Sequence, residues 1–450
     1  MEKKLALHIF RRDLRVDDNT ALKHSFNSSE KVIPCFIFDK RQVENNKYKS
    51  NNALQFMINS IQDLDTQIRK NGGRLYLFYG YTEDILKQLI NKFNLDLVSI
   101  NRDYTPFSRY RDNKLQTICE QLGIEFKKFS DILLTEPEQV HKDDGKPYTV
   151  FTPFYKKARK VPIKKPIKNN KKNYFTQPID FEENYSIFEK ILPKPKYDVR
   201  LKGGREEGLK LMQKDLSYYK EIRDYPRYNT SLLSAHNKFG TISIRELYHH
   251  SKDDIFISQL YWRDFYTHII FHFPHVLGNP FRQKFKKLEW ENDKTLFQAW
   301  CEGNTGFPIV DAGMRELNQT GYMHNRVRMI TASFLIKDLN IDWQWGEKYF
   351  AQKLIDYDPA VNNGNWQWVA STGSDSQPYF RIFNPWRQQQ RFDKNCEYIK
   401  KWVPELEKLT PKEIHNLHKK HSNIDYPKAI VDHQKQAEQA KAKYATISKL

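Results

Sequence analysis

The groups of this sequence that could do chemistry are concentrated between residues 321 and 393. This stretch brings two carboxylates, a carboxamide and two indoles within a few helical turns: Asp356, Asp358, Asn362, Trp366 and Trp368. Burying such groups together is costly unless each polar group has a partner. The pattern therefore predicts a pocket lined by aromatic rings and equipped with a few oriented polar groups, rather than an ordinary apolar core.

The segment before these residues has the apolar spacing of a helix. Asn325 and Met329 stand at i and i+4 in it, so we expect them to share one helical face with Tyr322. Arg326 lies in the same segment. We interpret His324 as a histidine that belongs to the helix structure and not as a general acid.

A second helix is predicted over residues 253–273, and one of its sides is unusual. Phe256, Gln259, Arg263 and Tyr266 recur on it at helical spacing, with Trp262 beside them. A side that mixes a carboxamide and a guanidinium with aromatic rings does not suit a plain core. It suits a wall between a flat aromatic cofactor and a polar substrate.

A group of hydroxyls, those of Thr230, Ser231 and Ser234, stands at the start of another apolar periodic segment. Amides and hydroxyls exposed at a helix start bind anions. The same residues are equally typical of simple helix capping, so both interpretations stay open at this point.

Charge and hydropathy limit the class of protein. The net charge of +19 over 450 residues favours a polyanionic partner. The four cysteines are widely spaced and indicate neither a metal site nor a disulfide framework. No apolar run approaches the ~20 residues of a membrane span. We expect a soluble intracellular protein without a metal, cytoplasmic or nucleoid-associated, or nuclear in a eukaryotic or viral setting.

The tryptophans are unevenly distributed. All nine lie between Trp262 and Trp402. A core needs Phe and Leu but has no reason to confine Trp to one part of the chain. The asymmetry indicates a function for indoles in the second half of the protein.

The first 135 residues alternate strand and helix patterns, which predicts a doubly wound α/β domain with a parallel sheet. We expect strands at 4–10, 31–39, 74–80 and 95–104 and helices at 19–26, 51–73 and 82–93, the last capped by Thr82. Ligands of such sheets bind beyond the carboxyl ends of the strands, which makes residues 101–112 a candidate rim. Neither a dinucleotide-binding fingerprint nor a P-loop is present.

A composition rich in Lys, Pro and Asn interrupts this pattern and predicts a solvated connector. Beyond it the sequence is helical to the end, with a short, charged tail from Pro411. We therefore predict an α/β domain at 1–135, a linker at 136–207 and a large all-α domain at 208–450.

Long strings of the sequence, among them MHNRVRMITASFLIKDL and NNGNWQW, resemble the flavin-binding signature of the photolyase/cryptochrome family. The resemblance covers nearly the whole chain and is specifically to class I cyclobutane pyrimidine dimer (CPD) photolyases. It implies an α/β domain followed by an all-α FAD-binding domain. It also implies a monomer that binds FAD and a second, antenna chromophore, which is a folate, a deazaflavin or a flavin in relatives.

The resemblance further implies light-dependent DNA repair. In this family, photoexcited FAD donates an electron to a dimer that has been flipped out of single- or double-stranded DNA. The positions that match FAD-binding residues are Tyr219, Thr230, Ser231, Ser234, Phe256, Arg263, Asp356, Asp358 and Asn362. The positions that match lesion- or DNA-binding residues are Gln259, Trp262, Asn325, Arg326, Met329, Trp368 and Arg381.

Three indoles match the family's electron-transfer chain from the flavin to the surface: Trp366, Trp343 and Trp290. Each of them could be a packing residue, but all three match together. We expect Asn362 to face flavin N5, and Arg263 and Arg326 to act as counter-charges for Asp356 and Asp358.

The alternatives are other members of the same family. A (6-4) photolyase uses a histidine pair where this chain has Asn325 and Met329. A cryptochrome photoreceptor often depends on a long C-terminal extension, which is absent from this sequence. Gln259 departs from class I enzymes, which place a Glu there, and matches (6-4) enzymes in this one position. We expect CPD repair, with Gln259 acting as a hydrogen-bond donor that has no proton to give.

Overall fold

The computed structural model describes residues 3–44, 46–194, 199–420 and 424–448. Contacts divide the chain into two compact units. Unit 1 comprises Met1–Tyr197, Leu201–Ser217 and Ser231–Pro274, and unit 2 comprises Asp198–Arg200, Tyr218–Thr230 and His275–Leu450. This division concerns contacts alone, so the predicted domain boundaries at residues 135 and 207 stay a prediction.

Unit 1 contains a five-stranded parallel sheet with the strand order β3-β2-β1-β4-β5. The strands are β1 (Lys3–Phe10), β2 (Ser29–Asp39), β3 (Tyr76–Gly80), β4 (Leu97–Asn101) and β5 (Glu125–Phe129). The first four confirm the predicted strands. The fifth escaped sequence analysis because its sequence, EFKKF, carries two lysines, which are typical of an edge strand but weaken the apolar signal.

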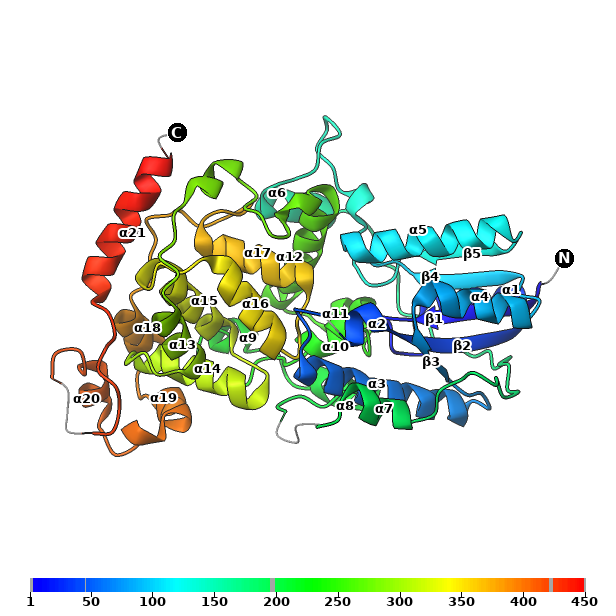
Figure 1. Ribbon diagram of the computed structural model, residues 1–450, viewed down its shortest axis with the longest axis horizontal. Coiled ribbons are helices and arrows are strands. Elements are labelled where there is room, and N and C mark those ends of the chain that lie inside the picture. The colour runs from blue at the N-terminus through cyan, green and yellow to red at the C-terminus, as the bar shows by residue number, and fades with distance from the viewer. Residues whose placement is uncertain (1–2, 45, 195–198, 421–423, 449–450) are drawn as a thin grey trace. The chain divides into compact units, whose positions relative to one another are not determined.

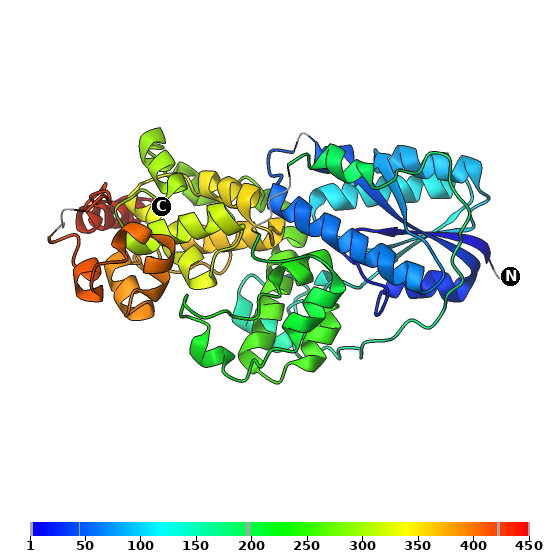
Figure 2. The same ribbon diagram turned by 90° about the horizontal axis from the view of Figure 1, so that it is seen from below.

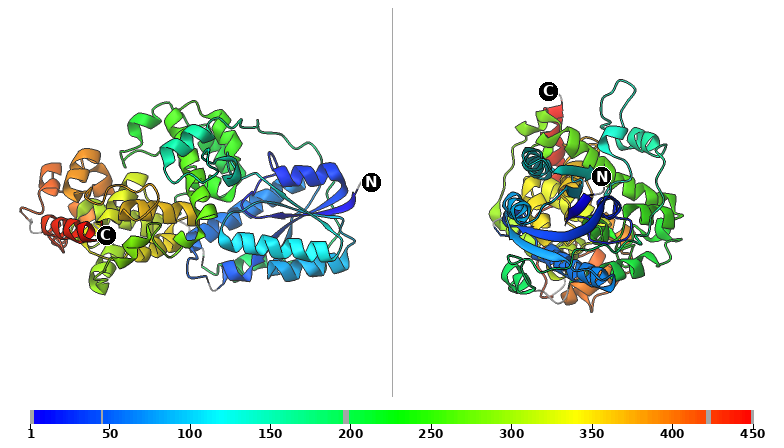
Figure 3. Two further views of the ribbon diagram at one scale, coloured as in Figure 1. Left: turned by 90° about the horizontal axis from the view of Figure 1, so that it is seen from above. Right: turned by 90° about the vertical axis from the view of Figure 1, so that its right-hand side faces the viewer.

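Helices cover both faces of this sheet (Figures 1 and 3), as predicted for a doubly wound domain. On one face, alternate strand residues such as Ile9 and Cys35 pack in one cluster with residues of α4 (Thr82–Lys92) and α5 (Pro106–Gln121). On the opposite face, the hydroxyl of Ser99 forms a hydrogen bond with Nδ1 of His8 at 3.0 Å. It forms a second one with the hydroxyl of Ser25 of α1 (Thr20–Ser28) at 2.6 Å.

The structure confirms the predicted end of one helix and contradicts the predicted cap of another. Helix α3 (Asn51–Lys70) ends next to Gly72, whose φ of +78° is left-handed, which confirms the predicted glycine stop. The prediction that Thr82 caps α4 was wrong, because Tyr81 occupies the cap position and makes no side-chain cap bond. The hydroxyl of Thr82 instead donates to Asp39 Oδ2 at 2.7 Å, at the end of β2.

Most of the predicted connector belongs to unit 1, and it is irregular from residue 159 to residue 185. It runs there as an extended segment (Figure 2). It is nevertheless anchored by specific hydrogen bonds. The amide of Ile167 donates to Asp18 Oδ1 at 3.1 Å, and the amide of Asp18 donates to the Ile167 carbonyl at 2.8 Å. A short parallel bridge joins Tyr174 to Val32 of β2.

The remaining helices of unit 1 include the one that carries the unusual face, α12. They are α2 (Lys40–Val43), η1 (Pro137–Gln139), α6 (Phe151–Ala158), α7 (Ser186–Ile191), α8 (Arg205–Met212), α10 (Ser234–Phe239), α11 (Ile244–His250) and α12 (Asp254–His272). The short turn η2 (Pro274–Val276) follows α12.

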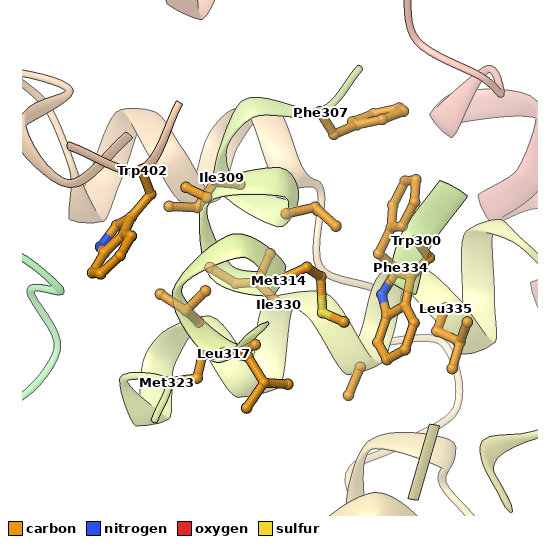
Figure 4. Packing of buried hydrophobic residues seen from close by; sticks show 14 of the residues in the cluster. Trp300, Phe307, Ile309, Met314, Leu317, Met323, Ile330, Phe334, Leu335 and Trp402 are labelled. Carbon is orange, nitrogen blue, oxygen red and sulfur yellow. The ribbon is translucent and has the colours of Figure 1, made fainter. Parts of the chain in front are cut away.

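Unit 2 is helical, which confirms the prediction for this part of the chain. Its elements are α9 (Tyr219–Ile222), η3 (Gln283–Lys287), α13 (Lys294–Glu302), α14 (Pro308–Thr320), α15 (Asn325–Ser333), η4 (Phe334–Asp338), α16 (Trp343–Lys353), α17 (Pro359–Ala370), α18 (Pro385–Phe392), α19 (Glu397–Trp402), η5 (Pro404–Leu406), α20 (Pro411–His415) and α21 (His433–Ser448). An aromatic-rich core, part of which Figure 4 shows around Trp300 and Phe334, packs most of these helices together, and a smaller cluster joins Phe285 of η3 to Tyr444 of α21. Within the described residues, no helix has the length and apolar character needed to cross a membrane.

A buried ion network fixes the interior of unit 1. Asp131 accepts from Arg15 at 2.5 Å and from Arg245 at 2.8 Å, and Arg245 also donates to Asp18 at 2.8 Å. Burial alone would raise the pKa of Asp131, but the charges of Arg15 and Arg245 outweigh it and lower the pKa to about 2. Breaking such a buried pair leaves uncompensated charge in the interior.

We expect Asp131→Asn to lower the free energy of unfolding by about 3 kcal/mol at neutral pH, because two buried guanidinium groups lose their counter-charge. The wild type should lose the same contribution only as the pH falls from about 4 toward 2. Urea unfolding at several pH values measures both. Asp180→Asn is the matched control, since Asp180 pairs with Lys92 at an exposed site and should cost less than about 1 kcal/mol. Equal losses in the two variants would contradict the assignment.

Candidate cofactor and substrate sites

The helix that carries Asn325 begins at that residue, and His324 is its cap. Nδ1 of His324 accepts from the Arg326 amide at 3.1 Å. Burial lowers the pKa of His324 to about 3, so the ring is neutral at physiological pH. This geometry agrees with a structural histidine. Tyr322 precedes the cap, so the expectation that it belongs to the same helix was wrong.

Asn325 and Met329 share one face of α15, as predicted. Asn325 Nδ2 lies 3.8 Å from Met329 Sδ, and the Asn325 side chain is exposed while Met329 is half-buried. A carboxamide and a thioether thus stand side by side at the surface of unit 2. Together they offer hydrogen bonds and a soft, adaptable contact to a ligand.

The counter-charge expected for Asp356 is supplied by a different arginine. Arg328 donates to Asp356 Oδ2 at 3.0 Å. Arg326 pairs with Asp224 at 2.8 Å, so its expected role beside Asp356 was wrong. The two arginines are two positions apart on α15 and therefore point to opposite sides of the helix.

The N-terminal half of α17 is held by its polar side chains. Asp358 is the N-cap and accepts from the amides of Ala360 at 2.9 Å and Val361 at 3.2 Å. Asn362 Nδ2 donates to the Glu347 carbonyl at 3.0 Å. Both residues therefore have a structural function in α17, and both side chains are buried.

Sequence analysis missed a buried carboxyl beside them. Glu347 Oε1 accepts from Asn363 Nδ2 at 3.0 Å, and burial raises the pKa of Glu347 to about 7. Gln367 continues this ladder by donating to Asn363 Oδ1 at 3.0 Å. Asn363 and Gln367 stand at i and i+4, so their helical spacing is a signal that could have identified the ladder.

Several buried polar side-chain atoms of unit 2 have no hydrogen-bond partner among the described residues, and Asp356 Oδ1 and Arg326 Nε are two of them. Unpaired buried polar groups are rare in native proteins and each needs an explanation. One acceptor and one donor left open in this way fit a polar ligand that carries both kinds of group.

The indoles of the expected chain lie in or against one core. Trp366 and Trp343 are each only 2% exposed, and the half-buried Trp290 packs against the same cluster. The ring centroid of Trp366 lies 5.0 Å from that of Phe350 and 6.3 Å from that of Trp300. Trp300, which Figure 4 shows in this core, is a neighbouring indole that sequence analysis did not single out.

A glycine makes room for the Trp366 ring. A Cβ at Gly346 of α16 would lie 2.1 Å from Cη2 of Trp366, which no real structure tolerates. The α16–α17 contact therefore depends on the absence of a side chain at this position, and it fixes where the indole lies.

The other predicted residues of unit 2 are spread over several elements. Trp368 is half-buried on α17, whereas Arg381 is exposed, next to Phe380, whose side chain is 61% exposed. Tyr219 is half-buried on α9. Thr230 is half-buried, in the segment before α10.

In unit 1, α12 presents the expected mixed side. Trp262 stacks on Phe151 with ring centroids 3.7 Å apart and an angle of 10°, while Phe256 is buried. Gln259 Nε2 donates to the Ile255 carbonyl at 3.1 Å and to Ser258 Oγ at 3.0 Å. Arg263 donates to the Ile132 carbonyl.

The hydroxyls of Ser231 and Ser234 do not cap α10. The cap position is Leu233, which makes no side-chain cap bond. Leu232 before it has a φ of +56°, a left-handed conformation that is costly for a branched residue. Strain of this kind persists where the surrounding structure requires it and is common at ligand sites.

The candidate rim of the sheet is a network of paired charges. Arg102 after β4 pairs with Glu136 at 2.9 Å and with Glu138 at 2.6 Å, and the Tyr104 hydroxyl donates to Glu136. Arg12 pairs with Asp103 at 3.1 Å. Among the residues described, no cluster of His, Cys, Asp or Glu could hold a metal ion.

Comparison with known proteins shows two matches to families. Residues 6–171 match the family described as DNA photolyase, and residues 256–446 match the family described as the FAD binding domain of DNA photolyase. The chain is 39% identical to the deoxyribodipyrimidine photo-lyase of Alkalihalophilus pseudofirmus, over 96% of each protein.

Solved structures give the same result. The archaeal photolyase from Sulfolobus tokodaii, which was solved with two FAD molecules, superposes with a TM-score of 0.92 at 44% identity and covers 98% of this chain and 100% of its own. A bacterial class III photolyase from Agrobacterium tumefaciens superposes with a TM-score of 0.91 at 37% identity and covers 100% and 99%.

The distinction between the two arginines of α15 can be measured. Arg328→Met leaves the buried carboxylate of Asp356 without its partner, so we expect a loss of about 2 kcal/mol in the free energy of unfolding, below the cost at a fully buried site. Arg326→Met is the control, because its partner Asp224 is 40% exposed, and it should cost less than about 1 kcal/mol. A larger loss in Arg326→Met would reverse the assignment.

Proposed function

Because the chain belongs to the DNA photolyase family, we propose that it is an FAD-dependent photolyase that splits cyclobutane pyrimidine dimers in DNA when it absorbs light. The observation that carries this function is the set of buried polar groups on α15–α17, within the segment that matches the FAD binding domain. It includes a carboxylate with an open acceptor atom, Asp356, and a buried carboxamide, Asn362.

The residues present fit the cofactor. Asp356, fixed by Arg328, has an oxygen available for a hydroxyl or ring N–H of FAD. Asn362 is held by Glu347 so that its carboxamide can serve flavin N5, and Asp358 fixes the start of the same helix. When bound and excited by light, reduced FAD would supply an electron to the dimer. The cyclobutane ring would then open, and the electron would return to the flavin. The chain's own contribution is to bind, orient and exclude water.

Further FAD contacts are proposed from the family positions. They are Tyr219, Thr230, Ser231, Ser234, Phe256 and Arg263. The absence of a side-chain cap on α10 supports this proposal for the two serines. Their hydroxyls are not needed to begin the helix.

The lesion requires a separate set of contacts. A dimer is damaged and poorly stacked, so it costs less to extrude than a normal base pair, and stacking on aromatic rings compensates for part of that cost. We assign stacking to Trp262 and Trp368, edge contacts to Asn325, Arg326 and Met329, and phosphate contact to Arg381. The exposure of Asn325 and Arg381 supports these roles.

The partner is damaged DNA, single or double stranded, and the net charge of +19 provides the attraction to phosphate. We propose a monomer that works in the cytoplasm or at the nucleoid. For the antenna chromophore, the two FAD molecules of the Sulfolobus relative favour a flavin over a folate or a deazaflavin.

Within the family, we propose the class I type of CPD photolyase, on the residues of α15. The class III relative has 37% identity and a similar fold, so fold alone does not separate the classes. A (6-4) photolyase would need a histidine pair where Asn325 and Met329 stand. A cryptochrome photoreceptor is the second candidate, and it would bind FAD without repairing DNA.

The direct test is repair of an oligonucleotide that contains one CPD, by protein with fully reduced FAD, under near-ultraviolet or blue light. We expect loss of the dimer in light and none in darkness. Parallel oligonucleotides that carry a (6-4) product provide the control. Repair of that product alone, or FAD binding without any repair, would contradict the proposal and favour one of the two alternatives.

The proposed electron chain predicts a separation of two activities. Trp366→Phe removes the buried indole next to the polar site, so light should no longer reduce oxidised FAD, while repair by chemically reduced protein should stay near the wild-type level. Absorption spectra and dimer loss measure the two. Trp402→Phe is the control, because Trp402 lies in the same core but outside the proposed chain. A collapse of both activities in Trp366→Phe would indicate a structural role.

Gln259 predicts a further pair of effects. Gln259→Leu removes a donor to the dimer carbonyl, and a lost hydrogen bond of ~1 kcal/mol corresponds to a repair yield about fivefold lower. Gln259→Glu can donate only while it is protonated, so repair should fall as the pH rises through the pKa of the new carboxyl, whereas the wild type should show no such dependence. Wild-type yield in Gln259→Leu would show that the residue is not a donor.

A further inference from the structure

Helix α21, red in Figure 1, is held within unit 2 by polar contacts as well as by the packing of Tyr444. The Tyr444 hydroxyl donates to the Ala370 carbonyl at 2.9 Å, and the amine of Lys337 lies 3.3 Å from the centre of the Tyr444 ring. Nδ1 of His433 and Oδ1 of Asp338 form a hydrogen bond at 2.5 Å. These contacts fix the position of the neighbouring residues on the helix.

One of those residues lies over an indole. Lys443 Nζ is 4.7 Å from the centre of the Trp290 ring, and it donates to the Glu289 carbonyl at 2.8 Å and to the side chain of Asn340. The amine therefore does not sample the surface freely. It is held by two acceptors above the ring.

The charged groups around this amine act in opposite directions. Burial lowers the pKa of Lys443 to about 8, while Glu291 and Glu289 act to raise it. Lys337 on η4 is a second, more deeply buried amine, and the charge of Lys443 contributes to lowering its pKa. Lys443 is therefore mostly protonated at pH 7 and loses its charge as the pH rises through about 8.

We propose that the positive charge of Lys443 makes Trp290 harder to oxidise and so limits the flow of electrons from the surface toward the buried indoles. In this sense Lys443 is an electrostatic brake on Trp290. The inference rests on the proposed function, in which Trp290 is the outermost member of the chain Trp366, Trp343 and Trp290. It adds a residue outside that chain, on a different helix, that sets how readily the chain works.

The physical reason is the sign of the charge. A cation over the face of an indole stabilises the neutral ring through its quadrupole. The same cation repels the positive charge that the ring acquires when it loses an electron, and partial burial strengthens this repulsion. Both effects make Trp290 harder to oxidise.

The step that Lys443 controls is a transfer of one electron. Trp290 gives an electron to the oxidised Trp343, which returns to its neutral form, and Trp290 becomes the oxidised ring. A thiol reductant in solution then restores Trp290 by giving up one electron. The thiol loses its proton to the solvent and becomes a thiyl radical, and two such radicals combine to a disulfide. The net result is that one electron from the thiol has entered the chain in place of the one that the light reaction removed. When Lys443 is charged, the step is less favourable and the separated charges recombine more often.

The test compares light-driven reduction of oxidised FAD in the wild type and in Lys443→Met, with a thiol as the electron donor. We expect a yield severalfold higher in Lys443→Met at pH 7. The wild-type yield should rise as the pH increases through about 8, and Lys443→Met should not show this rise. Lys443→Arg keeps the charge and should behave like the wild type at low pH but stay low as the pH rises.

The matched control is Lys441→Met, which removes the same charge two positions away, at an exposed site on the same helix. It should leave both the yield and its pH dependence unchanged. Repair by pre-reduced protein should be the same in all variants, because the brake acts only on the indole chain.

A readout that does not depend on the flavin is the titration of Lys443 itself. In protein labelled with carbon-13 at lysine Cε, one resonance should titrate near pH 8 and disappear in Lys443→Met, and Trp290→Phe should shift it by replacing the indole ring current with the weaker one of a phenyl ring. A pKa above 10 for Lys443, or equal photoreduction in Lys443→Met and the wild type, would overturn the inference.

The experiments distinguish a failure of this inference from a failure of the proposed electron chain. If Trp290→Phe blocks photoreduction while Lys443→Met has no effect, the chain is correct and only the brake is wrong. If Trp290→Phe itself has no effect, Trp290 is not a member of the chain, and both the chain assignment and the brake are overturned.

Discussion

The arrangement of unit 2 depends on a contact in which a side chain is absent. Gly346 lets the Trp366 ring lie directly on the backbone of α16, where a methyl group would overlap with it. This contact sets the distance between α16 and α17. It thereby lets Asn362 and Asn363 reach the carbonyl and the carboxyl of Glu347. The position of the indole and the orientation of the carboxamides are therefore one structural property, and neither can change without the other.

Much of the architecture could be predicted from local patterns. The central strands are apolar and rich in branched residues, so their signal is strong, whereas β5 is an edge strand whose lysines conceal it. The helical half and the shared face of Asn325 and Met329 followed from the spacing of residues alone. The sequence could not show which side chains form ion pairs with residues outside their own helix. Arg326 and Arg328 are equally plausible partners of Asp356, and only the start of α15 at its His324 cap decides which one faces it.

The same limit explains why Trp300 was missed. No motif surrounds it, and its contact with Trp366 joins residues that are far apart in the sequence. Its indole N–H donates to the Thr331 carbonyl at 3.1 Å, so the ring is held by α15 as well. The family positions single out three indoles, but the core holds more of them in contact, because the aromatic rings that fill it also stabilise it.

If Gln259 contacts the lesion as proposed, its hydrogen bonds have a consequence for how the protein discriminates among bases. Both donors of its carboxamide point to acceptors of its own helix, Ile255 and Ser258. The Gln259 side chain therefore carries no unsatisfied donor in this structure, and a ligand that contacts its Nε2 must exchange one hydrogen bond for another. Turning the carboxamide away from its helix costs these internal hydrogen bonds, so we expect that rotamer to be populated only when a well-placed acceptor replaces one of them. Selectivity then arises from a shift in side-chain populations, and a base that cannot supply the acceptor leaves the resting state undisturbed.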